Sequence, residues 1–224
     1  MTPQPTWAVI FDVDGTMVDN ADYHEEAWIV FGQRHGLPIT HDYYREHIHA
    51  RSNDLIVRQL YGEDIDATRA DQIAAEKEAT YRELYRPVLE PNPGLLDFLA
   101  KLRDAGLPCA AASNSPRPNV DMVLEELRIV DYFSVIVAQS PDMPGKPDPT
   151  MLLTVADGLG VAPGRCVVLE DSTSGFRAAE NAGMAYVVIA RGADPTCLDA
   201  ATSASAVHPD FTTLSLDELA RYAG

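Results

Sequence analysis

Five short apolar runs recur along the chain, and polar residues end or follow each of them. The runs are WAVIFDVD (7–14), LPCAAASN (107–114), VDYFSVIVAQS (130–140), RCVVLED (165–171) and MAYVVIA (184–190). Continuous runs of this kind are typical of strands buried on both faces of a parallel sheet. Helical patterns separate them, at residues 94–106, 119–129, 149–160 and 174–183. The alternation predicts an α/β fold, a doubly wound, Rossmann-like parallel sheet, closed by a short amphipathic helix in the last segment, 211–224.

Residues 20–88 break this rhythm, because three helical patterns follow one another there with no strand between them. The patterns cover residues 23–36, 41–62 and 66–86, and the proline-containing stretch RPVLEPNPG (86–94) reads as a stiff linker after them. We therefore expect a Rossmann-like catalytic core made of residues 1–18 and 89–224. A small helical cap domain, residues 19–88, is inserted after the first strand.

The composition indicates which kinds of molecule the chain can bind. The chain of 224 residues is 46% hydrophobic and 23% charged, as in folded globular proteins, and its formal net charge is −17. This negative charge argues against electrostatic binding to nucleic acid or to an anionic membrane surface. An anionic small-molecule substrate would need local cations, from lysine, arginine or a metal ion.

The sequence also indicates a reducing compartment. The first residues, MTPQPTWAVIF, lack the basic region of a signal peptide, and no apolar stretch is long enough to span a bilayer. The cysteines Cys109, Cys166 and Cys197 are odd in number and lack metal-ligand spacing. We expect Cys109 and Cys166 to be core thiols in a cytoplasmic protein that is a monomer or a weak oligomer.

The acidic residues at the end of the first run are the first candidates for chemistry. Asp12 and Asp14 are two positions apart, so their side chains point to the same side while the strand persists. Paired carboxylates can hold a divalent cation, or divide into a nucleophile and a general acid/base. A solvated acidic loop is the simplest alternative. A calcium loop is excluded because Gly15 follows Asp14 directly and a strand, rather than a helix, precedes it.

Four short motifs follow one another along the chain. They are DVDGT after the first apolar strand, Ser113 at the end of the next strand, Lys146 in GKPDP, and Glu170 with Asp171 in VVLEDSTSG. In this order they resemble the first, second, third and fourth motifs of the haloacid dehalogenase superfamily of phosphotransferases. Each motif alone can be interpreted as a helix cap or a surface charge. Because all four occur in order over essentially the whole chain, we favour the interpretation that they form a catalytic site.

The resemblance implies a mechanism. Asp12 would attack a phosphoryl group and form an aspartyl-phosphate, and Asp14 would protonate the leaving oxygen and then deprotonate the incoming water or hydroxyl. A Mg²⁺ ion would be held by Asp12, the backbone carbonyl of Asp14, and Asp171, with Glu170 bound to it directly or supporting these ligands.

The remaining motif residues would bind the phosphoryl oxygens. These are Ser113, Asn114 and Lys146, the lysine acting as a point charge. The presence of Asp14 argues for phosphate chemistry over dehalogenation, because displacing a halide needs no second acid. Asp19 is read only as a cap of the helix that follows.

The helical insertion resembles the small cap of the β-phosphoglucomutase-like branch. YHEEAW matches the opening helix of that cap and KEATY its last helix. By this match, His24 and Lys77 are candidates for coupling cap closure to the site. The alternative interpretations are a histidine on the helix surface and a solvated lysine. Arg117, shortly after the second motif, can orient the substrate or simply cover the surface.

The loop HIHARSNDLI matches the substrate loop of that cap only in part. It has Asn53 where the mutases carry arginine and Ala50 where they carry glycine, and Arg51 is the nearby substitute. A mutase must hold a bisphosphate and needs a firm second phosphate site. We therefore predict a phosphatase of small phosphorylated metabolites, specifically sugar phosphates. A sugar phosphomutase is the alternative, and a non-catalytic binding module is a third hypothesis.

Overall fold

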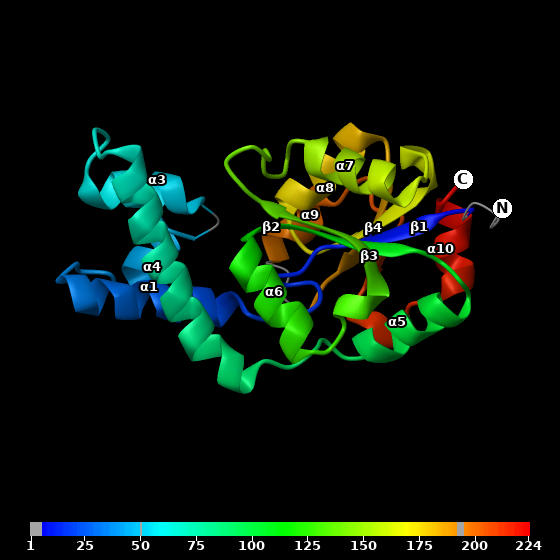
Figure 1. Cartoon of the computed structure of the whole chain (residues 1–224), viewed down its shortest axis with the longest axis horizontal. Coiled ribbons are helices and arrows are strands. Elements are labelled where there is room, and N and C mark those ends of the chain that lie inside the picture. Colours follow the sequence, from blue (N-terminus) through cyan, green and yellow to red (C-terminus); the bar gives the residue numbers. More distant parts are fainter. Residues whose placement is uncertain (1–5, 50, 192–194) are drawn as a thin grey trace. The chain divides into compact units, whose positions relative to one another are not determined.

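The computed structural model describes residues 6–49, 51–191 and 195–224, with the backbone alone for 195–197. The chain divides into two compact units (Figure 1). We call Met1–Asp19 with Leu89–Gly224 the core unit, and Asn20–Val88 the cap unit. The predicted departure at Ala50 lies outside the described residues.

The core unit contains one six-stranded parallel sheet, which confirms the predicted fold class. The strands are β1 (Ala8–Phe11), β2 (Cys109–Pro116), β3 (Phe133–Gln139), β4 (Cys166–Glu170), β5 (Ala185–Ile189) and β6 (Ala206–His208). Their order across the sheet is β3-β2-β1-β4-β5-β6. Each of the five apolar runs contains a strand. The sixth strand was not predicted, because three residues without an apolar run carry no periodic signal.

Helices cover both faces of this sheet (Figure 1). They are α5 (Leu95–Asp104), α6 (Arg117–Glu126), α7 (Thr150–Leu159), α8 (Thr173–Ala182), α9 (Pro195–Ala200) and α10 (Leu216–Tyr222), with 3₁₀ turns at Val130–Tyr132, Pro163–Arg165 and Phe211–Thr213. Within the described ranges, no helix combines the length and the apolar character needed to cross a bilayer.

Successive residues of β1 face opposite sides of the sheet, and each side has its own core. Ile10 belongs to a buried cluster with α7 and α8. Phe11 packs on the other side against Phe98 of α5, Phe133 and Phe211, with ring centroids 5.7 to 6.2 Å apart. The C-terminal segment thus closes this second face through Phe211.

The secondary structure of the cap unit in its described residues is helical, as the sequence predicted, with short loops between the helices. Its helices are α1 (Ala21–His35), α2 (His41–His47), α3 (Asn53–Tyr61) and α4 (Ala67–Tyr85), followed by a 3₁₀ turn at Arg86–Val88. The single helical pattern predicted over residues 41–62 forms two helices, α2 and α3. The hydroxyl of Ser52 accepts a hydrogen bond from the backbone N–H of Leu55 at 3.5 Å, and this N-cap starts α3 afresh.

Candidate active site

Three carboxylates meet where β1 and β4 end. Asp12 follows the last residue of β1, Glu170 ends β4, and Asp171 is next in the chain. The two strands are hydrogen-bonded neighbours, so these residues emerge at the same edge of the sheet. One ligand oxygen from each lies within 4.8 Å of the others. A group of hard oxygen ligands this compact can hold a divalent cation.

Lys146 lies among these acids. It belongs to the loop between β3 and α7, and its Nζ is 2.6 Å from Oδ1 of Asp12 and 2.7 Å from Oε1 of Glu170. All three side chains are buried. Because a buried charge is costly unless it is paired, Lys146 compensates the two acids that it contacts.

The compensation is incomplete, as the pKa values show. Burial raises the pKa of Asp12 well above its usual value, and Lys146 lowers it only in part. Burial raises the pKa of Asp171 in the same way, and the nearby Glu170 raises it further. For Lys146, burial lowers the pKa, but Asp12 and Glu170 outweigh it and the pKa is raised. One lysine against three carboxylates leaves room for a further positive charge, which Mg²⁺ fits.

Glu170 also organises the loop that follows β4. Its Oε2 accepts hydrogen bonds from the backbone N–H of Asp171 and of Ser172, both at 2.8 Å, and from the Ser172 hydroxyl at 2.9 Å. Gly175, in the first turn of α8, packs directly on this carboxylate, and a Cβ there would overlap it. Glu170 is therefore fixed on both oxygens, with Lys146 on the other one.

A tight turn follows β1, and a residue that sequence reasoning missed supports it. Gly15 has a φ of 80°, and a Cβ at this position would overlap the Asp171 carboxylate. Thr16 donates from Oγ1 to Oδ1 of Asp171 at 3.2 Å. The buried Asn92 donates from Nδ2 to the carbonyl oxygen of Thr16 at 2.7 Å. Asn92 is 76 positions away, so no local pattern could identify this contact.

Asp14 is held by two serines of β2. Ser115 donates from its hydroxyl to Oδ2 of Asp14, and Ser113 donates to the same oxygen at 3.4 Å. The backbone N–H of Ser115 donates to Oγ of Ser113 at 3.0 Å. Ser115 was not predicted as a site residue. The sequence offered one indication of its role. Ser115 is two residues beyond Ser113, so both side chains lie on the same side of β2, which continues past the predicted end of the strand at residue 114.

Asn114 and Arg117, two predicted site residues, each contact other residues of the core unit. Oδ1 of Asn114 accepts from the backbone N–H of Lys146 at 2.7 Å, and Nδ2 donates to the carbonyl oxygen of Lys146 at 3.1 Å. Its amide therefore fixes the backbone of the loop that carries Lys146. Arg117, exposed at the start of α6, pairs with Asp121, with Nε 2.6 Å from Oδ1.

The predicted pair His24 and Lys77 lies within the cap unit. Nζ of Lys77 is 3.0 Å from Nδ1 of His24 and 3.0 Å from Oε1 of Glu78. Lys77 is only 2% exposed, and its ammonium group lies 5.5 Å from the ring centroid of Trp28. The His24 ring stacks on Tyr81 at 3.9 Å. Lys77 is therefore not a solvated charge, whereas the half-buried His24 lies on α1 with its ring against Tyr81.

Asn53, the first residue of α3, lies beside a buried acid of α4. Asn53 donates from Nδ2 to Oε1 of Glu78 at 2.7 Å. The exposed Arg51 donates from Nη1 to Oε1 of Gln59 at 2.9 Å. Asn53, which the resemblance matches to an arginine of the mutases, is thus joined to a carboxylate, and Arg51 is bonded to Gln59 of α3.

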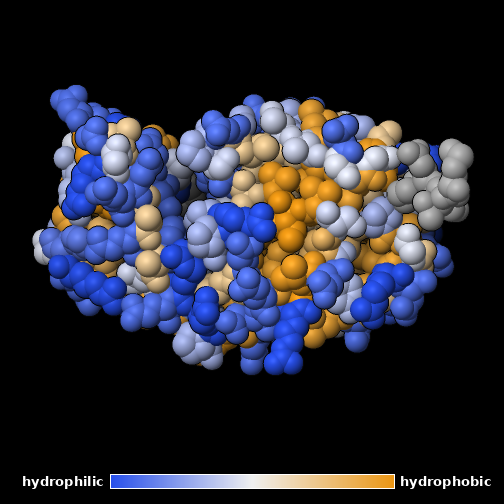
Figure 2. Space-filling model, viewed as in Figure 1, coloured by the Kyte–Doolittle hydropathy of each residue, from blue (hydrophilic) through white to orange (hydrophobic). Residues whose placement is uncertain are grey.

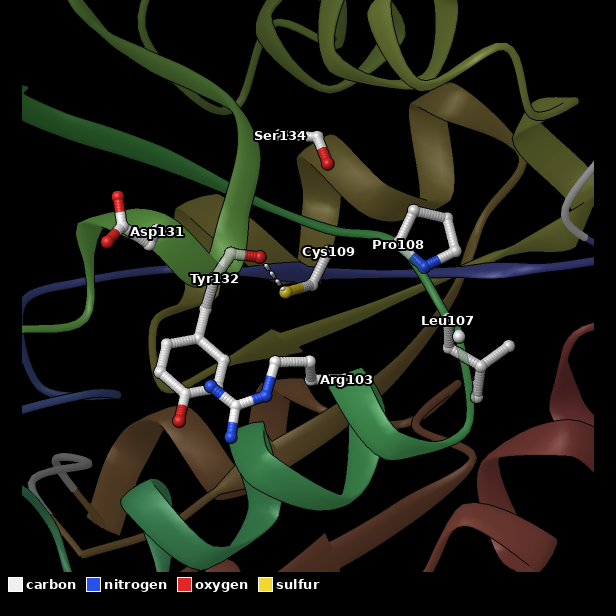
Figure 3. Close-up of a pocket in the computed structure, with 8 residues that line it drawn as sticks. Arg103, Leu107, Pro108, Cys109, Asp131, Tyr132 and Ser134 are labelled. Atoms are coloured by element: carbon white, nitrogen blue, oxygen red, sulfur yellow. Dashed lines mark hydrogen bonds between the residues drawn. The ribbon is translucent and has the colours of Figure 1, made fainter.

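A cavity of about 340 Å³ lies away from the carboxylates, where β2 and β3 begin (Figure 3). Arg103 lies 4.7 Å from the ring centroid of Tyr132, and Sγ of Cys109 donates to the Tyr132 carbonyl oxygen at 3.0 Å. Because the carboxylates follow the opposite ends of the strands, this cavity does not belong to their site.

The two described cysteines are buried, as predicted for core thiols. Burial raises the pKa of Cys109 to about 12 and that of Cys166 to about 11, so both thiols stay protonated at neutral pH. The side chain of Cys197 lies outside the described residues.

Comparison with known proteins places this site in a family. The family model of haloacid dehalogenase-like hydrolases matches residues 8–183. The chain is 31% identical over 192 residues to β-phosphoglucomutase of Bacillus subtilis, covering 83% of this chain and 84% of that protein. It is also 31% identical over 180 residues to the phosphorylated carbohydrates phosphatase of Thermotoga maritima, covering 79% and 82%.

A solved structure agrees with the fold. The crystal structure of a hydrolase of haloacid dehalogenase family IA, variant 3, from Entamoeba histolytica superposes with a TM-score of 0.88 at 24% identity, covering 97% of this chain and 99% of that one. The chain therefore belongs to the haloacid dehalogenase-like hydrolases, in the β-phosphoglucomutase-like branch that also contains sugar phosphatases.

Proposed function

We propose that this enzyme is a Mg²⁺-dependent phosphatase of small sugar phosphates that works through an aspartyl-phosphate on Asp12. The observation that carries the proposal is the buried contact of Lys146 with Asp12 and Glu170, beside Asp171. A carboxylate held against a lysine, with further acids for a cation, suits transfer of an anionic group. The relative from Thermotoga maritima is named as a phosphatase of phosphorylated carbohydrates.

In the first step, an oxygen of Asp12 attacks phosphorus in line with the ester bond. The P–O bond breaks, its electron pair leaves with the sugar oxygen, and Asp14 donates a proton to that oxygen. In the second step, Asp14 takes a proton from water, and the water oxygen attacks the phosphorus of the aspartyl-phosphate. This step releases inorganic phosphate and restores Asp12. Ser113 and Ser115 hold Asp14 for both transfers.

The charges around Asp12 serve the same reaction. Lys146 holds one oxygen of Asp12 and offers positive charge to the equatorial phosphoryl oxygens. The residues that would hold Mg²⁺ are Asp12, Asp171 and the carbonyl of Asp14, with Glu170 behind them. When bound, the ion neutralises charge on the transferring group. These local cations allow a chain of net charge −17 to bind an anion.

Hydrolysis is favoured over mutase chemistry by the cap unit. A mutase must bind a second phosphate group, which an arginine fork does well. In this chain Asn53 stands at the corresponding position and donates to Glu78, whose negative charge also pairs with Lys77. An anionic group bound there would compete with Glu78 for Lys77, and no arginine stands at position 53. The cap unit therefore suits a sugar with a single phosphate.

The test is release of inorganic phosphate from a panel of sugar phosphates and other small phosphomonoesters. Each substrate is assayed with Mg²⁺ or with a chelator, with and without a sugar bisphosphate, and the product isomers are resolved. We expect Mg²⁺-dependent release from sugar monophosphates. The Asp12→Asn variant should lose it, whereas Asp157→Asn, which changes an exposed acid of α7, should retain it.

Two other results would overturn the proposal. Isomer interconversion that requires the bisphosphate, with little phosphate release, would establish a sugar phosphomutase. Binding of phosphorylated ligands without turnover of any substrate, including a generic aryl phosphate, would indicate a binding module.

A further inference from the structure

The two edges of the sheet are protected to different degrees. β6 forms one edge and has only three residues, whereas β3 forms the other and has seven. β3 reads FSVIVAQ and contains no charged residue and no proline. Proteins commonly guard an exposed edge with lysine, proline or a very short strand. β3 has none of these, and its pairing with β2 has a register shift near each end, beside Phe133 and beside Gln139.

Apolar side chains around β3 are accessible to solvent. The strand residues 135–138 are half-buried. Val130, in the turn before β3, is 39% exposed, and Leu153 on the adjoining α7 is also 39% exposed. Figure 2 shows a continuous hydrophobic area on the face where Figure 1 shows β2 and β3. A patch of this kind marks an interaction surface.

The backbone of β3 can extend the sheet. Residues 135–138 pair in regular register with 110–113 of β2. Because β3 is an edge strand, no strand of the described residues lies on its other side. We propose that the β3 edge is a self-association surface, where a second copy of this chain adds its own β3 antiparallel and joins the two sheets.

A second copy fits this edge better than a charged partner does. Antiparallel pairing centred on the regular run places Ile136 opposite Val137 of the second copy, so uncharged side chains meet on both sides of the symmetry axis. In a chain of net charge −17, an uncharged strand avoids the repulsion that other surfaces of two copies experience.

The test is the molar mass of the whole chain in solution, measured by sedimentation equilibrium over a range of concentrations. We expect a reversible dimer whose fraction rises through roughly tens of micromolar chain. Ile136→Lys should raise the dimer dissociation constant at least about tenfold. Val207→Lys is the matched control, because Val207 is 54% exposed on the β6 edge, and it should leave the dimer unchanged.

A second variant keeps the test decisive if Ile136→Lys does not fold. The exposed Ser134 and Gln139 are both replaced by lysine, and thermal unfolding checks that the fold is intact. Dimerisation should weaken in this variant as well. A monomer at every concentration, or a dimer that persists in folded β3 variants, would overturn the proposal. Loss of phosphatase activity has no bearing on this measurement.

Discussion

The hydroxyl of Ser115 donates a hydrogen bond to Oδ2 of Asp14 and so ties the end of β2 to the loop that follows β1. Ser115 is itself fixed, because its backbone N–H donates to Oγ of Ser113 at 3.0 Å. The orientation of the Asp14 carboxylate is therefore determined by the neighbouring strand. For a residue proposed to move protons in both half-reactions, this orientation controls the rate.

Replacing Ser115 by alanine should lower kcat about tenfold and leave KM nearly unchanged, because an orienting contact to the acid/base acts mainly in the transition state. Ser115→Thr keeps the hydroxyl and should restore most of the activity. Steady-state kinetics of the three proteins on one sugar phosphate measures this. An unchanged kcat in Ser115→Ala would contradict the positioning role.

Removing the charge of Lys146 should affect both stability and rate. Lys146→Met leaves two buried carboxylates without their shared cation and should lower the free energy of unfolding by about 3–5 kcal/mol in metal-free protein. It should also reduce kcat/KM by about 10²–10³-fold. Urea unfolding and kinetics are compared with Lys101→Met, which removes an exposed lysine from α5 and should change neither. Equal stability of the two variants would contradict the role of Lys146.

Stabilisation by Mg²⁺ should increase with pH. The pKa values of Asp12 and Asp171 are raised in the folded chain, first by burial. Their contribution to stability is therefore fully present below their unfolded pKa, about 4, and is lost as the pH rises through the raised values. Mg²⁺ replaces the protons and reverses this loss.

Thermal unfolding at about pH 5 and about pH 8, with Mg²⁺ or with chelator at matched ionic strength, measures the effect. At a Mg²⁺ concentration of about 100 Kd, binding should contribute about 2.7 kcal/mol. The rise in Tm should be larger at the higher pH. An equal rise at both pH values would argue against binding at these carboxylates.

The packing of Gly175 on Glu170 allows a sharp comparison. Gly175→Ala places a methyl group on the Glu170 carboxylate. It should cost about 1–3 kcal/mol of unfolding free energy and, because Glu170 holds Lys146, reduce kcat/KM at least about tenfold. Gly164→Ala is the control, since no atom lies within 4 Å of its added Cβ, and it should shift stability by less than about 0.5 kcal/mol. Similar effects in both variants would show that Glu170 tolerates displacement.

The architecture was predictable because buried strands leave a strong pattern. Apolar runs located five strands, and parallel pairing then implied that the polar residues after β1 and β4 would converge, as Asp12 and Asp171 do. β6 was not predicted, because a strand of three residues shows no periodic pattern. The break between α2 and α3 was not predicted either, because the Ser52 N-cap is a single residue within one continuous apolar pattern.

The details of the site were less predictable, because hydrogen-bond partners depend on three-dimensional placement. The hydrogen bonds of the Asn114 side chain to the backbone of Lys146 were not predicted. Asn92 and Ser115 carried no motif signal, although both fix the loops around the carboxylates. The burial of Lys77 depends on aromatic neighbours from two helices, which helical periodicity does not reveal.

The most direct test of the account is to look for the phosphorylated enzyme itself. Wild-type protein with Mg²⁺ and a sugar phosphate that it hydrolyses is quenched in acid during turnover, digested, and analysed by mass spectrometry. We predict one phosphoryl group on the peptide that contains Asp12, absent without Mg²⁺ and absent in Asp12→Asn. A phosphoryl group on another residue, or full turnover in Asp12→Asn, would contradict the account.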